Sequence, residues 1–552
     1  DTALIVGKVL NYTDDTIRMN TYFDINGTKE NSKSINVFNY NVEKYNLTQD
    51  SAGTAKITFG LDKGDGYIDG EQRDLNIRIN GVERSTASLL SLNNDTTITF
   101  LPDSKLAGRT IFITNDPFDL IKRELKNLKE YEYDCNEQAA SKIKALLLEK
   151  KFLSNLNEKF EGEKELAKYI RKIEKNQNDD GSWGWWEKNA GDKWITGYIT
   201  ETMNLVVASG YRTKAHMKGA AYIKAQLPSM NISDKLEVLN VLASIPYPMD
   251  YLAEIDKIKD LNLSRQDQFQ YFKLLQSQGQ AIELKEVTES FEKGKEGIYW
   301  GEQLFNVKVN QLQTSLLAYQ ILKKAGGNDS LLKETRTYFL NYKNDAKNTI
   351  EQANMLQNFL EDMLMESNLK AALVPNITIN NSNAGDKYPM EFNFKGDEKI
   401  VIAKQGAPVK MYTYEHTVEL APTCSDSVFK ISTKFVENGK EVSQLTSGSP
   451  VTMEVEVIVR KNSTYVLLEI PIPAACVYGG AVTVRNYNEE YRKQYFDKTS
   501  IACRYLKPGR HTFTIQLIPR FEGSYSVLPA SVQLMYYPDI SNYATAKRIL
   551  VK

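Results

Sequence analysis

The feature that most constrains the fold of this chain is a change of hydrophobic period, from the period of strands to that of helices and back. Residues 1–115 contain short strand-like runs separated by Asn, Asp and Gly. In residues 119–366 apolar side chains recur every three or four positions, which predicts consecutive short helices. From residue 376 the strand pattern returns, for example in 453–457 and 510–517. This order predicts an αα-hairpin array, either an open solenoid or a closed toroid, between β-sandwich domains.

The composition limits the classes of function. A length of 552 residues exceeds one hydrophobic core and predicts about three or four domains. The 69 Lys and Arg nearly balance the 70 Asp and Glu, which argues against a general electrostatic nucleic-acid binder. The histidines His216, His416 and His511 are far apart in the sequence, so we expect no His-based metal site and no cofactor. No apolar run approaches the roughly 20 residues that span a membrane.

Two short segments are interpreted as ordinary β structure. Residues 62–69 space Asp and Gly much as a calcium loop does, but Leu61 and Lys63 would fall on ligand positions, so we predict a hairpin turn without metal. Residues 3–10 already have a strand pattern. We therefore expect a mature or excised fragment rather than a chain that starts with a signal peptide.

The candidate reactive site is the tetrapeptide Cys135-Asn-Glu-Gln138, directly before a helical pattern. Residues i and i+3 at a helix start lie on one face, so the thiol and the carboxamide can meet there. Attack of the thiol on the amide would expel ammonia and leave an internal thioester, whose acyl group is ready for transfer to a nucleophile. The bland interpretation is a buried cysteine that serves as a small apolar residue, because a four-residue motif is weak by itself.

Three separated segments resemble the alpha-2-macroglobulin and complement family, and more closely its bacterial members. Residues 128–138, with Tyr131 and Tyr133 before the tetrapeptide, resemble the opening of the family's thioester domain. Residues 178–198 resemble its Asp-Gly-Ser-aromatic and Trp-Leu-Thr-Ala segment. Residues 528–539 are similar to the closing strand of bacterial members, with its Met-Tyr-x-Pro signature. The three matches occur in the family's order, and the resemblance covers nearly all of the chain.

The resemblance implies the C-terminal portion of a bacterial-type alpha-2-macroglobulin, in which an α/α-toroid thioester domain is inserted between β-sandwich domains. The implied domains are a macroglobulin-like β-sandwich at 1–85, a CUB-like β domain in two parts at 86–115 and 371–421, the thioester domain at 116–370, and a C-terminal macroglobulin-like β-sandwich at 422–552.

By the same resemblance, the function is that of a broad-range protease inhibitor, a single-use covalent trap rather than an enzyme. Cys135 and Gln138 would form the thioester, supported by Glu137, Tyr131 and Tyr133. Lysine amines of the target protease would attack it. The family usually has Gly before the cysteine and often after it, where this chain has Asp134 and Asn136. Both residue types tolerate turn geometry.

Further expectations follow from the resemblance. Tyr536 or Tyr537 of the closing strand would cover the thioester, with Met535 beside them as a supporting residue. The complement branch uses a His in a stretch that corresponds to residues 295–311, which contain none here, so amines are favoured over hydroxyls. The resemblance also implies a monomer in the periplasm or at the cell surface, with any membrane anchor in the N-terminal region that this chain lacks.

Two alternatives of other classes stay open. Residues 177–183 fit the Gln-x-x-x-Gly-x-Trp pattern of triterpene cyclases, which share the α/α toroid, although no Asp-x-Asp-Asp cluster is present and residues 296–300 are at best a degenerate second copy. The other alternative is a structural or adhesive surface module, which would not need Gln138 opposite Cys135.

Two residue groups keep more than one interpretation. The tryptophans of residues 183–194 fit loop packing as well as the shielding of a thioester from water. Cys424, Cys476 and Cys503 allow at most one disulfide among them, and their pairing is open.

Overall fold

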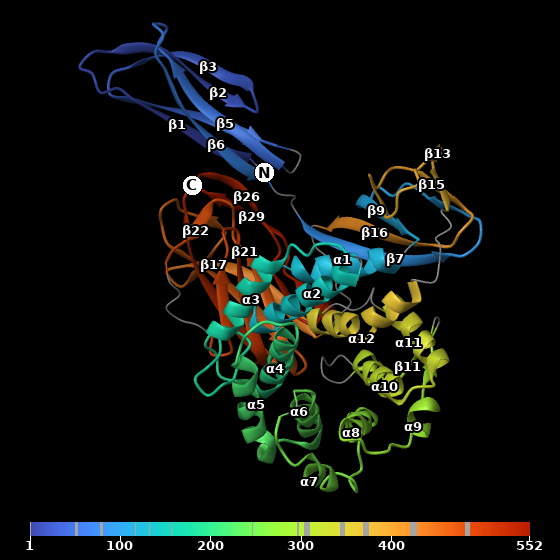
Figure 1. The fold of residues 1–552 in the computed structure, drawn as a ribbon. Coiled ribbons are helices and arrows are strands. Elements are labelled where there is room, and N and C mark those ends of the chain that lie inside the picture. Colours follow the sequence, from blue (N-terminus) through green and yellow to red (C-terminus); the bar gives the residue numbers. More distant parts are fainter. Residues whose placement is uncertain are drawn as a thin grey trace. The chain divides into compact units, whose positions relative to one another are not determined.

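The computed structural model of this protein describes residues 2–49, 53–77, 81–115, 117–131, 133–155, 157–245, 247–294, 297–302, 310–342, 348–367, 375–419, 428–480 and 486–552. The chain divides into two compact units. The first comprises residues 1–85, 105–107 and 416–552, and the second comprises residues 86–104 and 108–415. Figure 1 labels the elements of both.

The first unit begins with six strands, of which β2 and β4 alternate more and less buried side chains. These are β1 (Thr2–Leu10), β2 (Ile17–Ile25), β3 (Thr28–Val37), β4 (Tyr40–Thr48), β5 (Gly53–Asp62) and β6 (Ile68–Ile77). Phe23 of β2 packs against the rings of Tyr45 and Phe59. Leu61 of β5 is opposite Asp69 of β6, which confirms the predicted hairpin turn at residues 62–69.

The C-terminal part of the first unit holds two five-stranded sheets, in the orders β18-β17-β20-β25-β22 and β23-β24-β21-β27-β28. In β20, Val455 and Val457 are buried between half-buried glutamates, because alternate strand residues point to opposite faces. A third sheet, β19-β29-β26-β1-β4, joins the last strands to the first, with Thr2 opposite Ser524. The strands are β17 (Phe429–Glu437), β18 (Lys440–Val442), β19 (Gln444–Leu445), β20 (Val451–Val459), β21 (Ser463–Pro471), β22 (Cys476–Tyr478), β23 (Tyr491–Gln494), β24 (Lys498–Leu506), β25 (Gly509–Pro519), β26 (Gly523–Val527), β27 (Ser531–Leu534), β28 (Tyr537–Tyr543) and β29 (Lys547–Val551).

The second unit contains two four-stranded sheets, β13-β12-β15-β8 and β14-β9-β16-β7, whose strands come from both sides of the helical segment. Ile113 of β9 is opposite Met390 of β14, and Phe100 of β8 is opposite Ile400 of β15. The buried side chains of Ile111, Ile377, Ile402 and Met411 form their core. The strands are β7 (Val82–Leu92), β8 (Thr96–Phe100), β9 (Leu106–Thr114), β12 (Asn376–Ile379), β13 (Ser382–Asn383), β14 (Met390–Phe394), β15 (Ile400–Gln405) and β16 (Val409–Glu419).

The rest of the second unit is helical, as the period predicts. Its elements are α1 (Pro117–Lys129), α2 (Asn136–Asn155), α3 (Glu163–Lys175), α4 (Lys193–Ala208), α5 (Ala215–Gln226), the short η1 (Leu227–Ser229), α6 (Ile232–Ser244), α7 (Tyr251–Asp256), α8 (Arg265–Ser277), α9 (Lys285–Thr288), the two-residue strands β10 (Glu292–Lys293) and β11 (Ile298–Tyr299), α10 (Gln311–Ala325), α11 (Asp329–Tyr342) and α12 (Thr349–Ser367).

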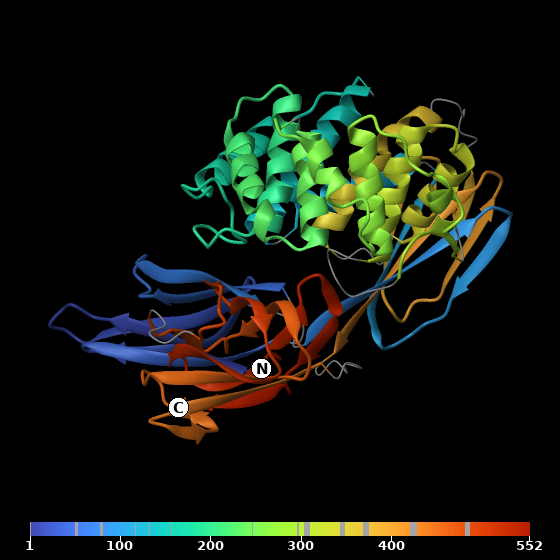
Figure 2. The same cartoon turned by 90° about the horizontal axis from the view of Figure 1, so that it is seen from below.

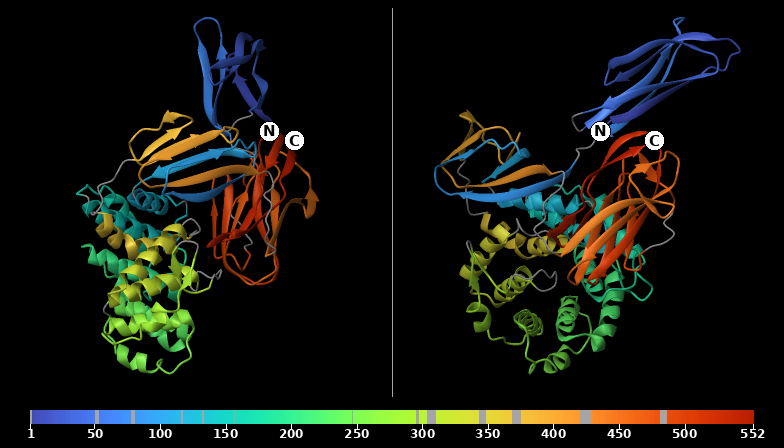
Figure 3. Two further views of the ribbon diagram at one scale, coloured as in Figure 1. Left: turned by 90° about the vertical axis from the view of Figure 1, so that its right-hand side faces the viewer. Right: turned by 180° about the vertical axis from the view of Figure 1, so that it is seen from behind.

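Alternate helices of this segment form a ring. Helices α2, α4, α6, α8, α10 and α12 each contact the next, and α12 contacts α2. The intervening helices contact the members of the ring, as α3 does α2 and α5 does α4. Figure 1 shows the ring, the right half of Figure 3 shows it from behind, and Figure 2 shows its helices running side by side.

The predicted order of a β segment, a helical segment and a second β segment is therefore confirmed. Within the described part of the chain, we find no helix long and apolar enough to cross a membrane.

Candidate covalent site

Most helices of the ring begin with a side chain that caps the backbone. Helices α4, α6, α8 and α10 are preceded by Asp192, Asn231, Ser264 and Asn310, and each of these side chains accepts a hydrogen bond from a backbone N–H of the first turn. Such side chains satisfy N–H groups that have no partner within the helix. The corresponding position of α2 is held by Cys135.

At this position the sequence forms one half of a capping box. The backbone N–H of Cys135 donates to the side-chain carbonyl Oε1 of Gln138 at 2.9 Å. In a capping box the residue three positions into the helix reaches back in this way to the N–H of the cap residue. The carboxamide carbon of Gln138 is thus held beside the cysteine, as the spacing of the motif predicts.

Both residues of the pair are withdrawn from water. Cys135 is 2% exposed and Gln138 is 3% exposed. Burial, and then the charge of Glu137, raise the pKa of the Cys135 thiol well above its ordinary value, although hydrogen bonds from the backbone of Gln138 and Glu137 act in the opposite direction. The site therefore favours an uncharged sulfur.

Glu137 is fully buried and is held by hydroxyl groups of two helices. Ser141 Oγ donates to Glu137 Oε1 at 2.8 Å, and Thr349 Oγ1 of α12 donates to the same oxygen at 2.7 Å. The hydroxyl of Tyr198, on α4, lies 2.8 Å from Ser141 Oγ. This chain of hydrogen bonds fixes the first turn of α2 against α4 and α12.

Asn136 connects the motif to the loop between α3 and α4. Its backbone N–H donates to Trp185 O at 2.9 Å, and its Nδ2 donates to Gly184 O at 2.9 Å and to Trp186 O at 3.2 Å. Its Oδ1 accepts from Asn176 Nδ2 at 2.7 Å. Among the described non-glycine residues with positive φ, neither Asn136 nor Asp134 appears. Neither Asp134 nor Asn136 therefore adopts the left-handed turn conformation that a glycine would allow.

Trp183 of this loop makes a set of hydrogen bonds that Trp300 repeats elsewhere in the ring. Trp183 Nε1 donates to Ile173 O, its backbone N–H donates to Thr196 Oγ1, and that hydroxyl donates back to Trp183 O. Trp300 makes the same set of bonds with Val287 O and with Ser315 Oγ. Of the degenerate second copy at residues 296–300, Trp300 thus makes the same bonds as Trp183, and these bonds favour the packing interpretation for both side chains.

Tyr131 and Tyr133 lie directly before the motif. Their rings pack edge to face with centroids 6.0 Å apart, and both are half-buried. Lys142 Nζ donates to Tyr131 O at 2.8 Å. Asp134 forms ion pairs with Lys142 at 3.2 Å and with Lys172 at 2.8 Å.

The other predicted site residues lie in the first unit, at the start of β28. Tyr536 packs edge-on against Tyr465 with ring centroids 5.4 Å apart, and the Met535 N–H donates to Tyr465 O at 2.8 Å. Met535 and Tyr537 are half-buried. Because the covalent site belongs to the second unit, the covering role of these residues stays a prediction.

The three histidines are distributed over both units. His216 is on α5 of the helical segment, where burial lowers its pKa. His416 of β16 and His511 of β25 belong to the first unit. Of the stretch 295–311, residues 295–296 and 303–309 lie outside the described part of the chain.

Among the described residues, Cys476 and Cys503 are buried cysteines that form no disulfide, and burial raises the pKa of each thiol to about 12. Cys424 lies outside the described residues, so the pairing of these three cysteines stays open.

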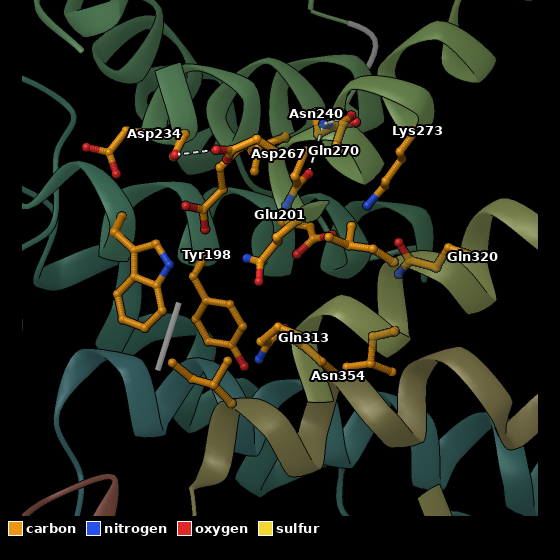
Figure 4. Close-up of a pocket in the computed structure, with 18 of the residues that line it drawn as sticks. Tyr198, Glu201, Asp234, Asn240, Asp267, Gln270, Lys273, Gln313, Gln320 and Asn354 are labelled. Carbon is orange, nitrogen blue, oxygen red and sulfur yellow. Dashed lines mark hydrogen bonds between the residues drawn. The ribbon is translucent and has the colours of Figure 1, made fainter. Parts of the chain in front are cut away.

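A polar pocket of about 330 Å³ lies within the ring, between α4, α6, α8, α10 and α12. Figure 4 shows the side chains of Tyr198, Glu201 and Lys273 pointing into it. Nine of its lining residues are Asn or Gln and four are Asp or Glu, and many of these bond to each other, as Asn240 does to Gln270 at 2.9 Å. A hydrocarbon polyene requires an apolar lining, so this pocket is poorly suited to a cyclase substrate.

Sequence reasoning predicted the contact between Cys135 and Gln138 but missed the groups that hold these residues. Ser141, Thr349, Asn176 and Lys172 belong to no motif. Ser141 alone left a signal, because it stands four residues after Glu137 on one helix face. The others come from distant helices, and only the tertiary structure brings them to the site.

Comparison with known proteins gives a sequence match and several structural ones. Residues 427–539 match the family model of the bacterial alpha-2-macroglobulin MG10 domain. No curated protein sequence matches the chain significantly.

Two solved structures from Escherichia coli have a similar fold. Native alpha-2-macroglobulin spanning domain MG7 to the C-terminus superimposes with a TM-score of 0.75 and 15% identity, over 100% of this chain and 97% of that one. The native conformation of the longer E. coli protein gives 0.74 and 15%, over 100% of this chain and 39% of that one.

A third structure, Salmonella alpha-2-macroglobulin reacted with methylamine, gives 0.73 and 15%, over 100% of this chain and 40% of that one. The chain thus has the fold of these proteins, and it spans about 40% of the length of the longer ones.

Proposed function

Residues 427–539 belong to the MG10 domain family of bacterial alpha-2-macroglobulins, and from this premise we propose that the chain is the thioester-bearing C-terminal part of a protease inhibitor of that family. In this proposal the ring of helices is the α/α-toroid thioester domain. The whole inhibitor would be a single-use trap in the periplasm or at the cell surface. Cleavage by a protease would expose the thioester to a lysine amine of the attacker.

The observation that carries the proposal is the bond from the Cys135 N–H to Gln138 Oε1 at 2.9 Å. It places the carboxamide at the cysteine and polarises its carbonyl toward attack. The thiol sulfur would attack the carboxamide carbon of Gln138, the bond to nitrogen would break, and ammonia would leave with the thiol proton. The structure of Salmonella alpha-2-macroglobulin reacted with methylamine supports amine chemistry at such a site.

The same geometry suits the later transfer step. An amine attacks the carbonyl carbon, oxygen carries the developing negative charge, and the Cys135 N–H remains aimed at that oxygen. The C–S bond then breaks, an amide forms on residue 138, and the sulfur leaves as a thiol. Without a histidine to act as a nucleophilic catalyst, hydroxyl groups have no comparable route.

The proposal predicts a defined mass and a defined reaction. A formed thioester lowers the intact mass by one ammonia, roughly 17 Da, and methylamine adds to Gln138 while one thiol appears. Glycerol in place of methylamine should give little ester. The Cys135→Ala variant should show none of this, whereas Cys503→Ala, which removes a buried thiol of the other unit, should react normally.

The contrary result is also defined. Native protein with the full mass, a titratable thiol at Cys135 and no incorporated amine would leave a structural or adhesive module as the better interpretation. Efficient ester formation with glycerol would contradict only the preference for amines, and would direct attention to His216, His416 and His511.

A further inference from the structure

Two lysines stand beside the candidate thioester, and both bind one carboxylate. Lys172 Nζ lies 2.8 Å from Asp134 Oδ2 and donates to Asp134 O at 2.5 Å. Lys142 Nζ lies 3.2 Å from Asp134 Oδ1 and also donates to Tyr131 O at 2.8 Å. Asp134 is the residue immediately before Cys135, so both ammonium groups are held next to the motif.

Each lysine is held at the backbone or helix turn that carries Cys135 and Gln138. Lys142 follows Gln138 by four positions on α2, and side chains at this spacing are neighbours on the helix surface. Lys172 donates to the carbonyl oxygen of Asp134, whose carbon is bonded to the nitrogen of Cys135. Lys142 is 6% exposed at its side chain, so it has little access to water as an alternative partner.

This arrangement places the proposed thioester next to its own class of nucleophile. A lysine amine in the same domain has a large advantage over one on another molecule, because effective molarities of well-oriented groups reach about 10⁵–10⁸ M. A protonated lysine has no lone pair and cannot attack. Self-acylation is therefore prevented only while both amines keep their protons and their places.

The contacts of Asp134 supply both conditions. Its carboxylate neutralises two ammonium groups that would otherwise repel each other, and its carbonyl takes a further proton of Lys172. Burial alone would raise the pKa of Asp134, but Lys172 and then Lys142 outweigh it and lower that pKa, so the carboxylate stays charged. Tyr169 Oη, 3.4 Å from Lys142 Nζ, completes the set of groups around this lysine.

We propose that Asp134 is a positioning residue that holds Lys142 and Lys172 as bound ammonium ions, and so keeps the thioester from acylating its own domain. The proposal rests on the proposed thioester. Without the carboxylate, a lysine Nζ attacks the carbonyl carbon of residue 138, the C–S bond breaks, and the sulfur takes the proton that the amine loses. The products are an internal isopeptide bond and the free Cys135 thiol, with no change in mass from the thioester form.

The test compares wild type with Asp134→Asn, which keeps the size and removes the charge. We expect the variant to lose methylamine reactivity at least several-fold faster than wild type. Peptide mapping should find residue 138 joined to Lys172 or Lys142, with a thiol released and no water added. Adding Lys142→Arg and Lys172→Arg to the variant should restore the lifetime, because a guanidinium stays protonated and is not a nucleophile.

A second measurement covers the case in which Asp134→Asn does not fold. Wild-type protein is held near pH 10, where lysine amines begin to lose their protons, and compared with the Lys142→Arg/Lys172→Arg double variant. The isopeptide should form in wild type only.

Loss of reactivity by hydrolysis alone, or at the wild-type rate, would overturn the role of Asp134. Wild-type protein that never incorporates methylamine would instead overturn the proposed thioester, so the two failures are distinguishable.

Discussion

Asn136 ties the first turn of α2 to the tryptophan loop through bonds to Gly184 O, Trp186 O and Asn176 Nδ2. The family that this chain resembles often has Gly at this position. A glycine could make none of these side-chain bonds. Of the bonds described above, only the one from the backbone N–H of residue 136 to Trp185 O would then remain. The amide side chain therefore contributes rigidity where the motif would otherwise depend on backbone geometry.

We predict that Asn136→Ala destabilises the helical segment by about 1–3 kcal/mol, because Gly184 O loses the donor and Asn176 Nδ2 loses the acceptor that the Asn136 side chain provides. The melting temperature should fall, and methylamine reactivity should decay faster as the loop loosens. Asn155→Ala, at the exposed end of the same helix, is the matched control and should change stability by less than about 0.5 kcal/mol. Equal melting temperatures for the two variants would show that the side-chain bonds of Asn136 carry no weight.

For single residues, the sequence predicts which side chains can react with each other, but it does not predict which distant side chains surround them. The spacing of Cys135 and Gln138 predicts their contact, because both belong to one helix start. The partners of Asp134 could not be predicted in the same way. Lys172 lies on α3, and nothing in its local sequence indicates that it returns to the motif.

Among the elements, α12 is joined to the start of α10 by a buried carboxyl group. Glu351 is 4% exposed, and Asn310, the cap of α10, donates to it at 2.8 Å. Burial raises its pKa to about 7, although the bonds from Asn310 and Asn348 lower it in part. At a pH between 4.5 and about 7, the Glu351 carboxyl group is protonated in the folded state and ionised in the unfolded state.

The sign of the resulting pH dependence follows from that difference. The contribution of Glu351 to stability is fully present below its ordinary pKa of 4.5 and is lost as the pH rises through about 7. We predict that wild type loses about 3 kcal/mol relative to Glu351→Gln between pH 4.5 and pH 8. Melting temperatures of both proteins across this range would measure it.

Glu334→Gln, at an exposed position of α11, should follow the wild-type curve. Parallel curves for wild type and Glu351→Gln would contradict the shift.

The elements also show where sequence patterns lose information. Strands β20 and β25 were predictable because alternation survives in their sequences. The sequence indicated only weakly that Trp183 and Trp300 occupy equivalent positions. The hydroxyl partner follows by 13 residues in one case and by 15 in the other, and it changes from Thr196 to Ser315.

For the whole molecule, the proposed cover of the thioester is the prediction that joins the two units. The resemblance, with its Met-Tyr-x-Pro signature, supports this role for Tyr536 and Tyr537. Replacing both with Ala should shorten the half-life of methylamine reactivity several-fold, because aromatic rings exclude water from the acyl group. The control is Tyr487→Ala, since Tyr487 is 90% exposed. A half-life that is the same in the double variant and the control would rule out the covering role.

At this largest scale the sequence predicted the order of β, helical and β segments but not their pairing. Period and turn residues report local structure, whereas the register of Ile113 with Met390 depends on contacts between distant strands. The same limit applies to the ring, because the contact of α12 with α2 joins the two ends of the helical segment.

This pairing has a consequence for synthesis. In the described sheets, β7, β8 and β9 have neighbours only among β14, β15 and β16, which follow the helical segment. A ribosome that adds roughly 5–20 residues per second needs on the order of 15–60 s to cover the roughly 280 residues from Ile113 to Met390. For that time the nascent strands present open edges, which pair readily with other chains. The helical ring can form meanwhile, and it brings the late strands to the early ones.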